Sequence, residues 1–332
     1  MNQTLRYSAL LLLLTAAAAA PATQRAVLVG ISDYQLVPPL EGPLHDVALI
    51  RSSLVDHWQF EDANILTLTN EQATKRNILD AIASLGTDGA PGDTVFIYFS
   101  GHGTSAADTS LSVSIPTKTG ALVPHDVRGV KTHQELLNRL IIGKRDLQPV
   151  LKQLDRAGFN VFIVVDACYS GNVIRDTKRL DGLPTRFLRL SDLLPRNARR
   201  ARLGKRLKFN PNEPFPYQNV FSLSAAQEYE TTQDIPSAML KKYPTLDGKP
   251  HGAFTDSFAR VLSGSHDGDI DGNKILTLTE LSESVTKLMR DRNFSSTPQL
   301  LPRQTETAIN LANQALFGAL LEAHLPTDQP SF

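Results

Sequence analysis

The strongest constraint on the fold of this chain is a series of short apolar runs, rich in β-branched and aromatic residues, that recur along most of its length. Runs of this kind favour strands that are buried on both faces, as in parallel sheets. The candidate strands are Ala26 to Ile31, Asn64 to Thr69, Thr94 to Ser100, Asn160 to Ala167 and Asn219 to Ser224. We therefore expect a central sheet with both faces covered.

The segments between these runs have apolar residues at helical spacing. The predicted helices are Leu44 to His57, Thr74 to Leu85, Asp146 to Ala157, His251 to Leu262 and Leu278 to Met289. Alternating strands and helices predict an α/β fold, a three-layer sandwich in which a mostly parallel sheet has helices on both faces. The 332 residues are 41% hydrophobic and show no internal repeat, so we expect one large domain rather than a string of modules.

Residues 1–22 have the pattern of a signal peptide. Arg6 precedes an apolar run from Tyr7 to Ala20, and alanines at positions 18, 20 and 22 offer a small-residue cleavage site. The run is too short to span a bilayer comfortably. We expect an exported protein, periplasmic or extracellular, with no stable membrane insertion after the signal is cleaved.

The chain has a single cysteine, Cys168, so no internal disulfide can form. Cys168 directly follows one predicted strand, and His102 follows another. Because parallel strands end at the same edge of a sheet, the thiol and the imidazole can meet there. An imidazole that takes the thiol proton is the usual way to activate a cysteine nucleophile. Either residue alone is more often a packing or turn residue, but the pair indicates catalysis.

Glycines flank both candidate residues. Gly103 lets the backbone approach a substrate closely, and its N–H can converge with that of Cys168 on a developing oxyanion. The sequence therefore predicts a site built from Cys168, His102 and the backbone of Gly103.

One segment departs from the alternation. Arg175 to Lys208 contains twelve Lys or Arg residues and three Asp residues, with Pro184 and Pro195 between them. The segment has a net charge of +9 in a chain whose total is zero, so the rest carries −9. We interpret it as an exposed basic linker between a larger N-terminal part and a smaller C-terminal part. A solvated loop without function is an equal alternative.

Two motifs resemble those of a known family. Ser100-Gly101-His102-Gly103 resembles the S-G-H-G motif, and the run from Asp166 to Gly171 resembles the metacaspase motif D-x-C-[HY]-S-G. The chain thus resembles the C14 group of cysteine peptidases, which comprises metacaspases, paracaspases and caspases, with bacterial metacaspases as the nearest kin. The resemblance implies a caspase-like sandwich with a p20-like catalytic region at 25–174, a basic linker at 175–215 and a p10-like region at 216–322.

The resemblance also implies an acidic specificity pocket. Leu40 stands where a caspase has its Asp-binding Arg, Asp46 and Asp166 stand where acids favour a basic P1 residue, and Glu230 falls where a third acid would lie. Carboxylates hold a guanidinium in bidentate fashion, so Arg is expected to be preferred over Lys. The alternative is that Asp46 only pairs on its helix and Asp166 only orders the nucleophile loop.

The resemblance therefore implies an endopeptidase that cleaves proteins or peptides after Arg or Lys. Its own linker, with Arg175, Lys178 and Arg179 near the site, offers candidate positions for self-processing. Two alternatives are a catalytically silent scaffold or sensor, and a binder of anionic partners through the basic segment. Nucleic acid is not the expected partner, because the net charge is zero. The sequence carries no signal for an oligomeric state.

No cofactor is required by this chemistry, although calcium is the recurrent activator of the family. The acids that follow S-G-H-G in many metacaspases are nearly absent, with Asp108 alone before Val123. Asp269 to Glu280 has the acid and amide spacing of an EF-hand loop, but Lys274 replaces its glycine at position six. We expect an acid-rich turn before a helix, with calcium activation as the alternative.

Overall fold

The structure is a computed structural model, and it describes residues 22–108, 113–115, 119–168, 182–198, 215–227 and 230–302. The predicted signal peptide up to residue 21, the linker residues 175–181 and 199–214, and the C-terminal residues from 303 lie outside these ranges. So do the candidate cleavage positions Arg175, Lys178 and Arg179. Within the described ranges, no helix has both the length and the apolar character needed to cross a bilayer.

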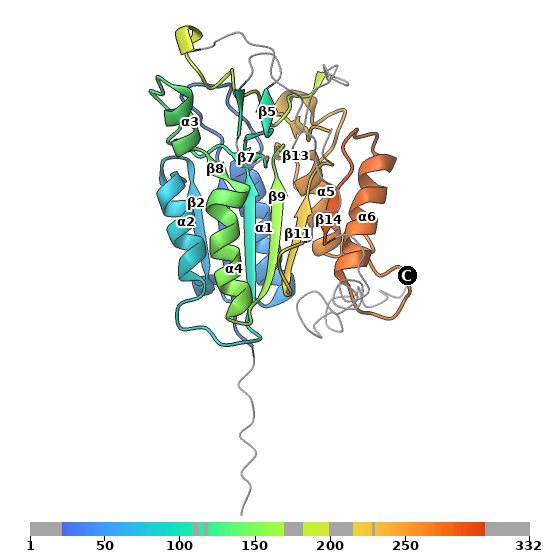
Figure 1. Cartoon of the computed structure of the whole chain (residues 1–332). Coiled ribbons are helices and arrows are strands. Elements are labelled where there is room, and N and C mark those ends of the chain that lie inside the picture. Colours follow the sequence, from blue (N-terminus) through green and yellow to red (C-terminus); the bar gives the residue numbers. More distant parts are fainter. Residues whose placement is uncertain are drawn as a thin grey trace, which may run out of the picture.

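A six-stranded sheet forms the centre of the molecule, with the order β14-β11-β9-β3-β1-β2 (Figure 1). Its strands are parallel except for β14, which pairs antiparallel with β11 at one edge. The bounds are β1 Gln24–Gly30, β2 Ile65–Thr69, β3 Thr94–Ser100, β9 Asn160–Asp166, β11 Val220–Ser224 and β14 Gln299–Leu301. The five predicted strands are confirmed, and β14 is an addition.

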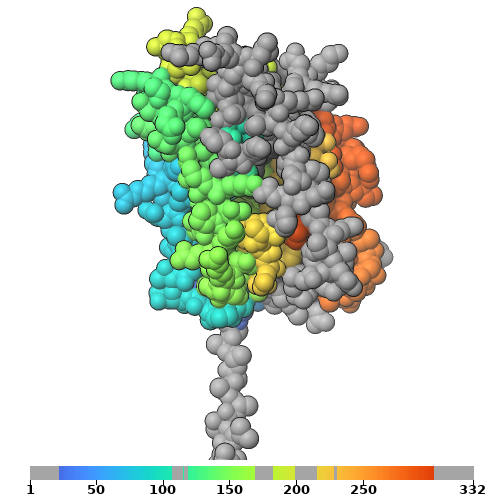
Figure 2. Space-filling view, viewed as in Figure 1, coloured from blue at the N-terminus to red at the C-terminus, as the bar shows by residue number. Residues whose placement is uncertain are grey.

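Helices cover both faces of this sheet. They are α1 Pro43–Trp58, α2 Lys75–Ser84, α4 Gln148–Arg156, α5 Ala253–Leu262 and α6 Leu278–Asp291, whereas α3 His133–Arg139 lies beyond the carboxyl end of the sheet. Helices α2 and α4 pack together on one face of the sheet, where they form the cyan and green surface of Figure 2. Helices α1 and α5 cover the other face, and α6 packs on α5. The five predicted helices and the three-layer arrangement are confirmed.

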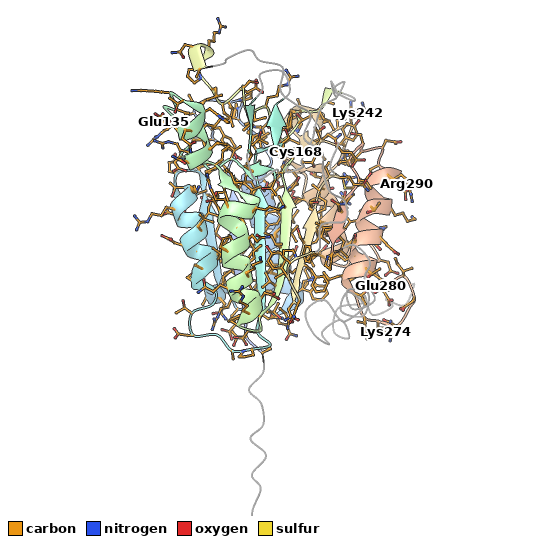
Figure 3. All side chains as sticks on the ribbon, viewed as in Figure 1. Glu135, Cys168, Lys242, Lys274, Glu280 and Arg290 are labelled. Carbon is orange, nitrogen blue, oxygen red and sulfur yellow. The ribbon has the colours of Figure 1, made fainter. Side chains whose placement is uncertain are left out.

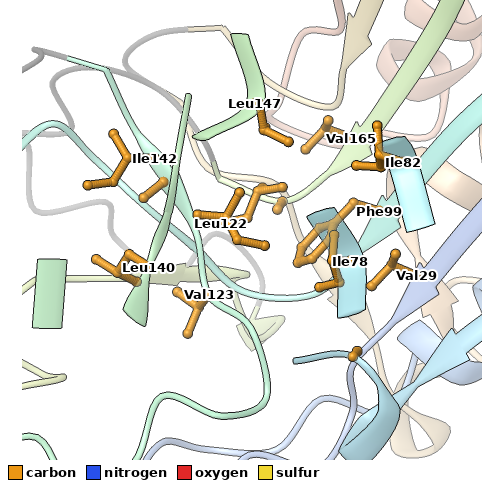
Figure 4. Packing of buried hydrophobic residues seen from close by; sticks show 14 of the residues in the cluster. Val29, Ile78, Ile82, Phe99, Leu122, Val123, Leu140, Ile142, Leu147 and Val165 are labelled. Carbon is orange, nitrogen blue, oxygen red and sulfur yellow. The ribbon is translucent and has the colours of Figure 1, made fainter. Parts of the chain in front are cut away.

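The strands alternate their side chains between two hydrophobic cores. Along β1, Val27 and Val29 enter the core under α2 and α4, whereas Ala26 and Leu28 enter the core under α1 and α5. In Figure 4 the first core joins Val29 of the sheet to residues beyond the strand ends, such as Leu122 and Ile142. Each fully buried aliphatic or aromatic side chain contributes roughly 1.5–3 kcal/mol to folding. The two cores therefore fix the position of the sheet, whose parallel strands all have their carboxyl ends at the same edge.

Short strands cross that carboxyl edge. One small sheet has the order β10-β4-β7-β8, and two further pairs are β12 with β13 and β5 with β6. Their bounds are β4 Gly103–Thr104, β5 Ala107–Asp108, β6 Val113–Ser114, β7 Ala121–Leu122, β8 Ile141–Ile142, β10 Phe187–Leu188, β12 Asp234–Ile235 and β13 His251–Gly252. Two-residue strands have no readable periodicity, so none of them was predictable.

The described part of the basic linker, residues 182–198, is packed against the domain, which corrects the prediction of an exposed loop. Leucines between its basic residues are buried, among them Leu183, Leu188 and Leu190, and Arg186 is buried as well. Arg189 and Arg196 remain exposed. The charge count was misleading because it ignored these interspersed leucines, whose burial fastens the segment to the domain.

Candidate active site

The carboxyl ends of β3 and β9 bring the two catalytic candidates to one edge of the sheet. Ser100 and Asp166 are paired across the two strands, and His102 and Cys168 follow each of them by two residues. A β-carbon on Gly103 would lie 2.8 Å from the carbonyl carbon of Cys168, so the two loops touch and only glycine fits there. Figure 3 places Cys168 at this end of the sheet.

His102 is held in a defined tautomer. Its Nε2 lies 2.9 Å from the carbonyl oxygen of Pro38, and its backbone N–H donates to the hydroxyl of Tyr34 at 2.8 Å. A carbonyl oxygen can only accept, so Nε2 carries the proton and neutral imidazole leaves Nδ1 as the basic nitrogen. Nδ1 is buried and has no hydrogen-bond partner among the described residues. Burial lowers the pKa of His102 to about 4, against an opposing effect of the hydrogen bond to Pro38.

Cys168 lies in the loop that contacts Gly103, in an equally closed setting. Its side chain is 1% exposed, and its Sγ accepts the backbone N–H of Thr232 at 3.2 Å. Burial raises the pKa of the Cys168 thiol to about 12. The backbone of Arg186 opposes both of these shifts, because it acts to raise the pKa of His102 and to lower the pKa of Cys168. Both side chains are therefore neutral in this state.

The side chain of Arg186 fills an acidic pocket next to Cys168. One guanidinium nitrogen, Nη2, lies 2.7 Å from carboxylate oxygens of both Asp46 and Asp234. The other, Nη1, lies 3.0 Å from Asp166 Oδ2 and donates to the Ser100 hydroxyl at 2.7 Å. Both terminal nitrogens of the guanidinium are thus held in charge-assisted hydrogen bonds.

Each of the three carboxylates is itself held in place. Asp46 accepts from His251, Ser100 and the backbone N–H of Gly252. Asp166 accepts from the hydroxyls of Thr232 and Thr255 and from the backbone N–H of Thr255, and Asp234 accepts from the backbone N–H groups of Glu41 and Gly42. The pocket is therefore a fixed cage of acceptors.

Two glycines form the walls of this cage. A β-carbon on Gly42 would lie 2.6 Å from Nη2 of Arg186, and one on Gly252 would lie 2.7 Å from the same atom. These distances are below any real contact of a β-carbon, so a larger residue at either position would displace the guanidinium. The pocket has room for a flat cation between two bare backbones.

The pocket has more negative than positive charge. Burial acts to raise the pKa of Asp46, but Arg186, His251 and Ser100 together outweigh it and lower the pKa. Burial raises the pKa of Asp166 to about 6; the guanidinium of Arg186 opposes this rise, and the charge of Asp46 adds to it. Burial likewise raises the pKa of Asp234. Despite its own burial, Arg186 keeps a pKa well above its ordinary value because the carboxylates surround it. The pocket is built for a cation.

Among the three acids predicted from sequence, Asp46 and Asp166 meet in this pocket and Glu230 does not. Glu230 instead accepts from the backbone N–H and hydroxyl of Thr297 and from the N–H of Gln227, so it ties the loop after β11 to the segment before β14. The third acid is Asp234, four residues further along. The residues that sequence reasoning missed are Asp234 and Arg186, and neither stands in a recognisable motif.

The EF-hand-like loop lies at the other end of the molecule, where Figure 3 labels Lys274 and Glu280 far from Cys168. Ligand atoms of Asp269, Asp271 and Glu280 lie within 4.8 Å of one another. Asp269 accepts three backbone N–H groups of the turn, and Glu280 closes a capping box with Thr277 at the start of α6. Lys274 adopts a positive φ of 65°, the conformation for which an EF-hand uses glycine.

Residues 24–177 match the family model of the metacaspase, peptidase C14 domain. Residues 24–177 are thus a metacaspase-like region. The resemblance drawn from the two motifs is thereby confirmed at the level of the family, and the predicted caspase-like α/β fold is confirmed with it. The matched range includes the His102 and Cys168 loops and the acids Asp46 and Asp166.

This metacaspase-like region is similar to parts of several longer proteins. Metacaspase-7 of Arabidopsis thaliana is 29% identical over 176 residues, which cover 49% of this chain and 38% of that protein. Metacaspase-1 of Plasmodium falciparum is 32% identical over 161 residues, which cover 46% of this chain and 24% of that protein. Metacaspase-2 of Arabidopsis thaliana is 33% identical over 158 residues, which cover 46% of this chain and 35% of that protein. The matches thus span well under half of these relatives.

Among solved structures, protein GSU0716 from Geobacter sulfurreducens superposes with a TM-score of 0.58. The match covers 90% of this chain and 99% of that protein at 18% sequence identity. At this identity the likeness concerns the fold alone. It extends over both sides of the linker, so the fold comparison supports a single folded unit that includes the region after β11.

Proposed function

We propose that this protein is a cysteine endopeptidase that cleaves after Arg, and more slowly after Lys, with Cys168 as nucleophile and His102 as base. The observation that carries the proposal is the guanidinium of Arg186, held by three buried carboxylates beside the thiol. The similarity of residues 24–177 to the metacaspase, peptidase C14 domain supports the reaction class. No cofactor takes part in the proposed steps.

The geometry supports a simple division of roles. Because Nε2 of His102 is engaged by Pro38, Nδ1 takes the thiol proton as Sγ of Cys168 attacks the substrate carbonyl carbon. The N–H of Gly103, which donates to the carbonyl oxygen of Arg186 at 3.0 Å, can donate in the same way to the developing oxyanion of a substrate. A raised thiol pKa and a lowered imidazole pKa both favour the neutral pair, so proton transfer accompanies attack instead of preceding it. The imidazolium then protonates the leaving amine.

The same pocket supports a preference for Arg over Lys. The guanidinium of Arg186 spreads its donors over Asp46, Asp166, Asp234 and Ser100. An ammonium is a point charge with three donors and cannot reach all of these acceptors at once. Loss of one charge-assisted hydrogen bond costs about 1.5–3 kcal/mol, so we expect Arg to be preferred by about tenfold or more.

Two further parts of the proposal rest on sequence patterns. The linker is proposed to be a site of self-processing, since it supplies basic residues close to a site that binds them. Export is proposed from the signal-peptide pattern of residues 1–22. Deleting these residues should shift the protein into the cytoplasmic fraction of the producing cell, and unchanged fractionation would contradict export.

A peptide panel tests the proposal. Purified protein lacking residues 1–22 is assayed on fluorogenic peptides that differ only in ending with Arg, Lys or Asp, with and without calcium. We expect cleavage after Arg, weaker cleavage after Lys and none after Asp, and loss of activity in Cys168→Ala and His102→Ala. Efficient cleavage after Asp would contradict the pocket assignment, and activity that survives in Cys168→Ala would contradict the nucleophile.

A further inference from the structure

His251 lies in the wall of the acidic pocket and is fully buried. It begins β13, which pairs antiparallel with β12, the strand that begins with the pocket residue Asp234. Its Nδ1 lies 2.9 Å from Oδ1 of Asp46, and its Nε2 lies 2.9 Å from Oδ1 of Asp247. One imidazole therefore joins a carboxylate of the pocket to a carboxylate that reaches solvent.

Both ring nitrogens of His251 must donate in this arrangement. Burial acts to raise the pKa of Asp46 and of Asp247, but their partners outweigh it and lower both, so each is an ionised carboxylate that only accepts. A neutral imidazole has one N–H and would turn a lone pair toward one of the two carboxylates. Burial acts to lower the pKa of His251, yet Asp46 and Asp247 outweigh it and raise this pKa. The geometry therefore requires an imidazolium.

The two oxygens of Asp46 face different partners. Oδ1 accepts from His251 and from the backbone N–H of Gly252 at 3.0 Å, so it is bound by the wall of the pocket. Oδ2 accepts from the Ser100 hydroxyl and from Nη2 of Arg186, both at 2.7 Å, so it faces the cation inside the pocket. The wall cation and the pocket cation thus bind opposite oxygens of one carboxylate.

Of these two cations, only His251 stays when the occupant of the pocket changes. Arg186 must leave before a substrate arginine can bind, and the buried carboxylates that hold it then lack a guanidinium. Burial favours the protonated form of a carboxyl group that has no cation beside it. We propose that the imidazolium of His251 is a positioning residue, which keeps Asp46 ionised and oriented in the vacant pocket for the guanidinium of a P1 arginine. This inference rests on the proposed peptidase function and adds a residue to its specificity pocket.

Charged and titratable groups face His251 from each neighbouring element. Helix α1 contributes His45, whose ring meets that of His251 edge to face at a centroid distance of 6.1 Å. The loop before β13 contributes Asp247 and Lys249, whose Nζ lies 3.4 Å from Oδ2 of Asp247. The pocket contributes Asp46, with the guanidinium and the other two carboxylates beyond it. Since Asp247 does not line the pocket, its substitution changes the environment of His251 from outside.

The first test is the pH dependence of substrate binding. Protein lacking residues 1–22 is compared with His251→Asn, whose side-chain amide can still donate to Asp46 but carries no charge. A cation in contact with a carboxylate lowers its pKa by about 1–3, so in the variant Asp46 takes up a competing proton at higher pH. We expect KM for an Arg-terminated peptide to rise about tenfold or more at pH 6 and to lie within about threefold of wild type at pH 9. The value of kcat should change little.

The second test reads the charge of the ring without enzymatic turnover. Nitrogen-15 NMR of the histidine rings in Cys168→Ala distinguishes an imidazolium from either neutral tautomer, and the added substitution His251→Asn identifies the resonances. We expect both ring nitrogens of His251 to carry protons at pH 7. With Asp247→Asn the ring should lose its proton at a lower pH, because one of the two carboxylates that raise its pKa is neutralised. Asp291→Asn is the matched control, since it neutralises a carboxylate that pairs with Lys287 on α6 and should leave the titration unchanged.

The outcomes separate this inference from the proposed function. A protein that hydrolyses Arg-terminated peptides while the ring of His251 is neutral at pH 7 contradicts the inference and leaves the peptidase assignment standing. So does a KM that rises by the same factor at every pH in His251→Asn, because lost packing alone gives that result. A folded protein with a charged His251 that cuts no peptide contradicts the proposed function, and the role assigned to His251 falls with it. Thermal melting shows whether His251→Asn folds; if it does not, the titration shift in Asp247→Asn identifies the ring and decides the inference.

Discussion

Removal of one pocket carboxylate, Asp234→Asn, is the sharpest perturbation of the specificity site. Asp234 was not singled out by any motif, so its role rests on geometry alone. Its Oδ1 lies 2.7 Å from Nη2 of Arg186, and its Oδ2 accepts the N–H groups of Glu41 and Gly42 at 3.0 and 3.3 Å. Asparagine keeps the shape and one acceptor but loses the charge that faces the guanidinium.

The size of the effect follows from these contacts. Breaking one side of a buried charge pair costs about 2–5 kcal/mol, and two other carboxylates still balance the cation, so the lower half of that range applies. A loss of about 2–3 kcal/mol lowers kcat/KM for an Arg-terminated peptide by about 30- to 150-fold. The free energy of unfolding should fall less than this, because burial raises the pKa of Asp234, which means that its charge is costly when no guanidinium is bound.

The assay compares kcat/KM and the thermal midpoint of the self-processed protein with those of Asp234→Asn. Glu230→Gln is the matched control, since it neutralises a carboxylate in the same segment that contacts Thr297 instead of the pocket. We expect this control to retain kcat/KM within about twofold of wild type. If Asp234→Asn also stays within about twofold while folded, the pocket occupied by Arg186 is not where a substrate arginine binds.

Three further predictions follow from other contacts. Gly252→Ala should lower kcat/KM for Arg-terminated peptides by at least about 100-fold, because its β-carbon would enter the space of the guanidinium. An unchanged kcat/KM would contradict this by showing that the pocket can widen to accept the methyl group. Burial raises the pKa of Asp166 to about 6 and lowers the pKa of His102 to about 4. The rate of self-cleavage should therefore decline below about pH 6, as Asp166 takes a proton and holds the guanidinium less tightly, and should fall by a further tenfold or so per pH unit below pH 4, where the imidazolium cannot accept a proton. A single transition near pH 6.5 in quenched time courses would contradict the lowered pKa of His102. Asp269→Ala should lower the free energy of unfolding by about 1–3 kcal/mol, measured by denaturant titration, because the N–H groups of Gly272 and Lys274 lose their acceptor whereas that of Asn273 keeps Asp271. It should leave kcat/KM within about twofold, and a larger kinetic loss would mean that this loop affects the active site.

The main fold was predictable because its strands and helices are long and periodic. The five predicted strands and five predicted helices are present with shifts of one or two residues at their ends. The edge strand β14 has three half-buried residues, and the strands over the carboxyl edge have two residues each, too few for a pattern. Those short strands form because other segments of the same chain lie alongside them and supply backbone hydrogen-bond partners. Which segments lie together is decided by the fold and not by the local sequence.

The candidate site was predictable where residues sit next to a strand end. His102, Gly103 and Cys168 come directly after the ends of β3 and β9, and the family resemblance adds Asp46 and Asp166. Asp234 and Arg186 were not predictable, because they meet through a pairing of strand segments 48 residues apart whose register no spacing reveals. Charge counting even placed Arg186 in an exposed loop, whereas three carboxylates offset the cost of burying it.

Covalent capture tests most directly whether Cys168 is a nucleophile that serves an arginine pocket. Purified protein is treated with a peptide that ends in an arginine chloromethyl ketone, and the adduct is located by intact mass and peptide mapping. The account predicts one adduct per molecule on Cys168, slow labelling in His102→Ala, and no labelling by the matching aspartate reagent. An adduct on another residue, or equal labelling by the aspartate reagent, would contradict it.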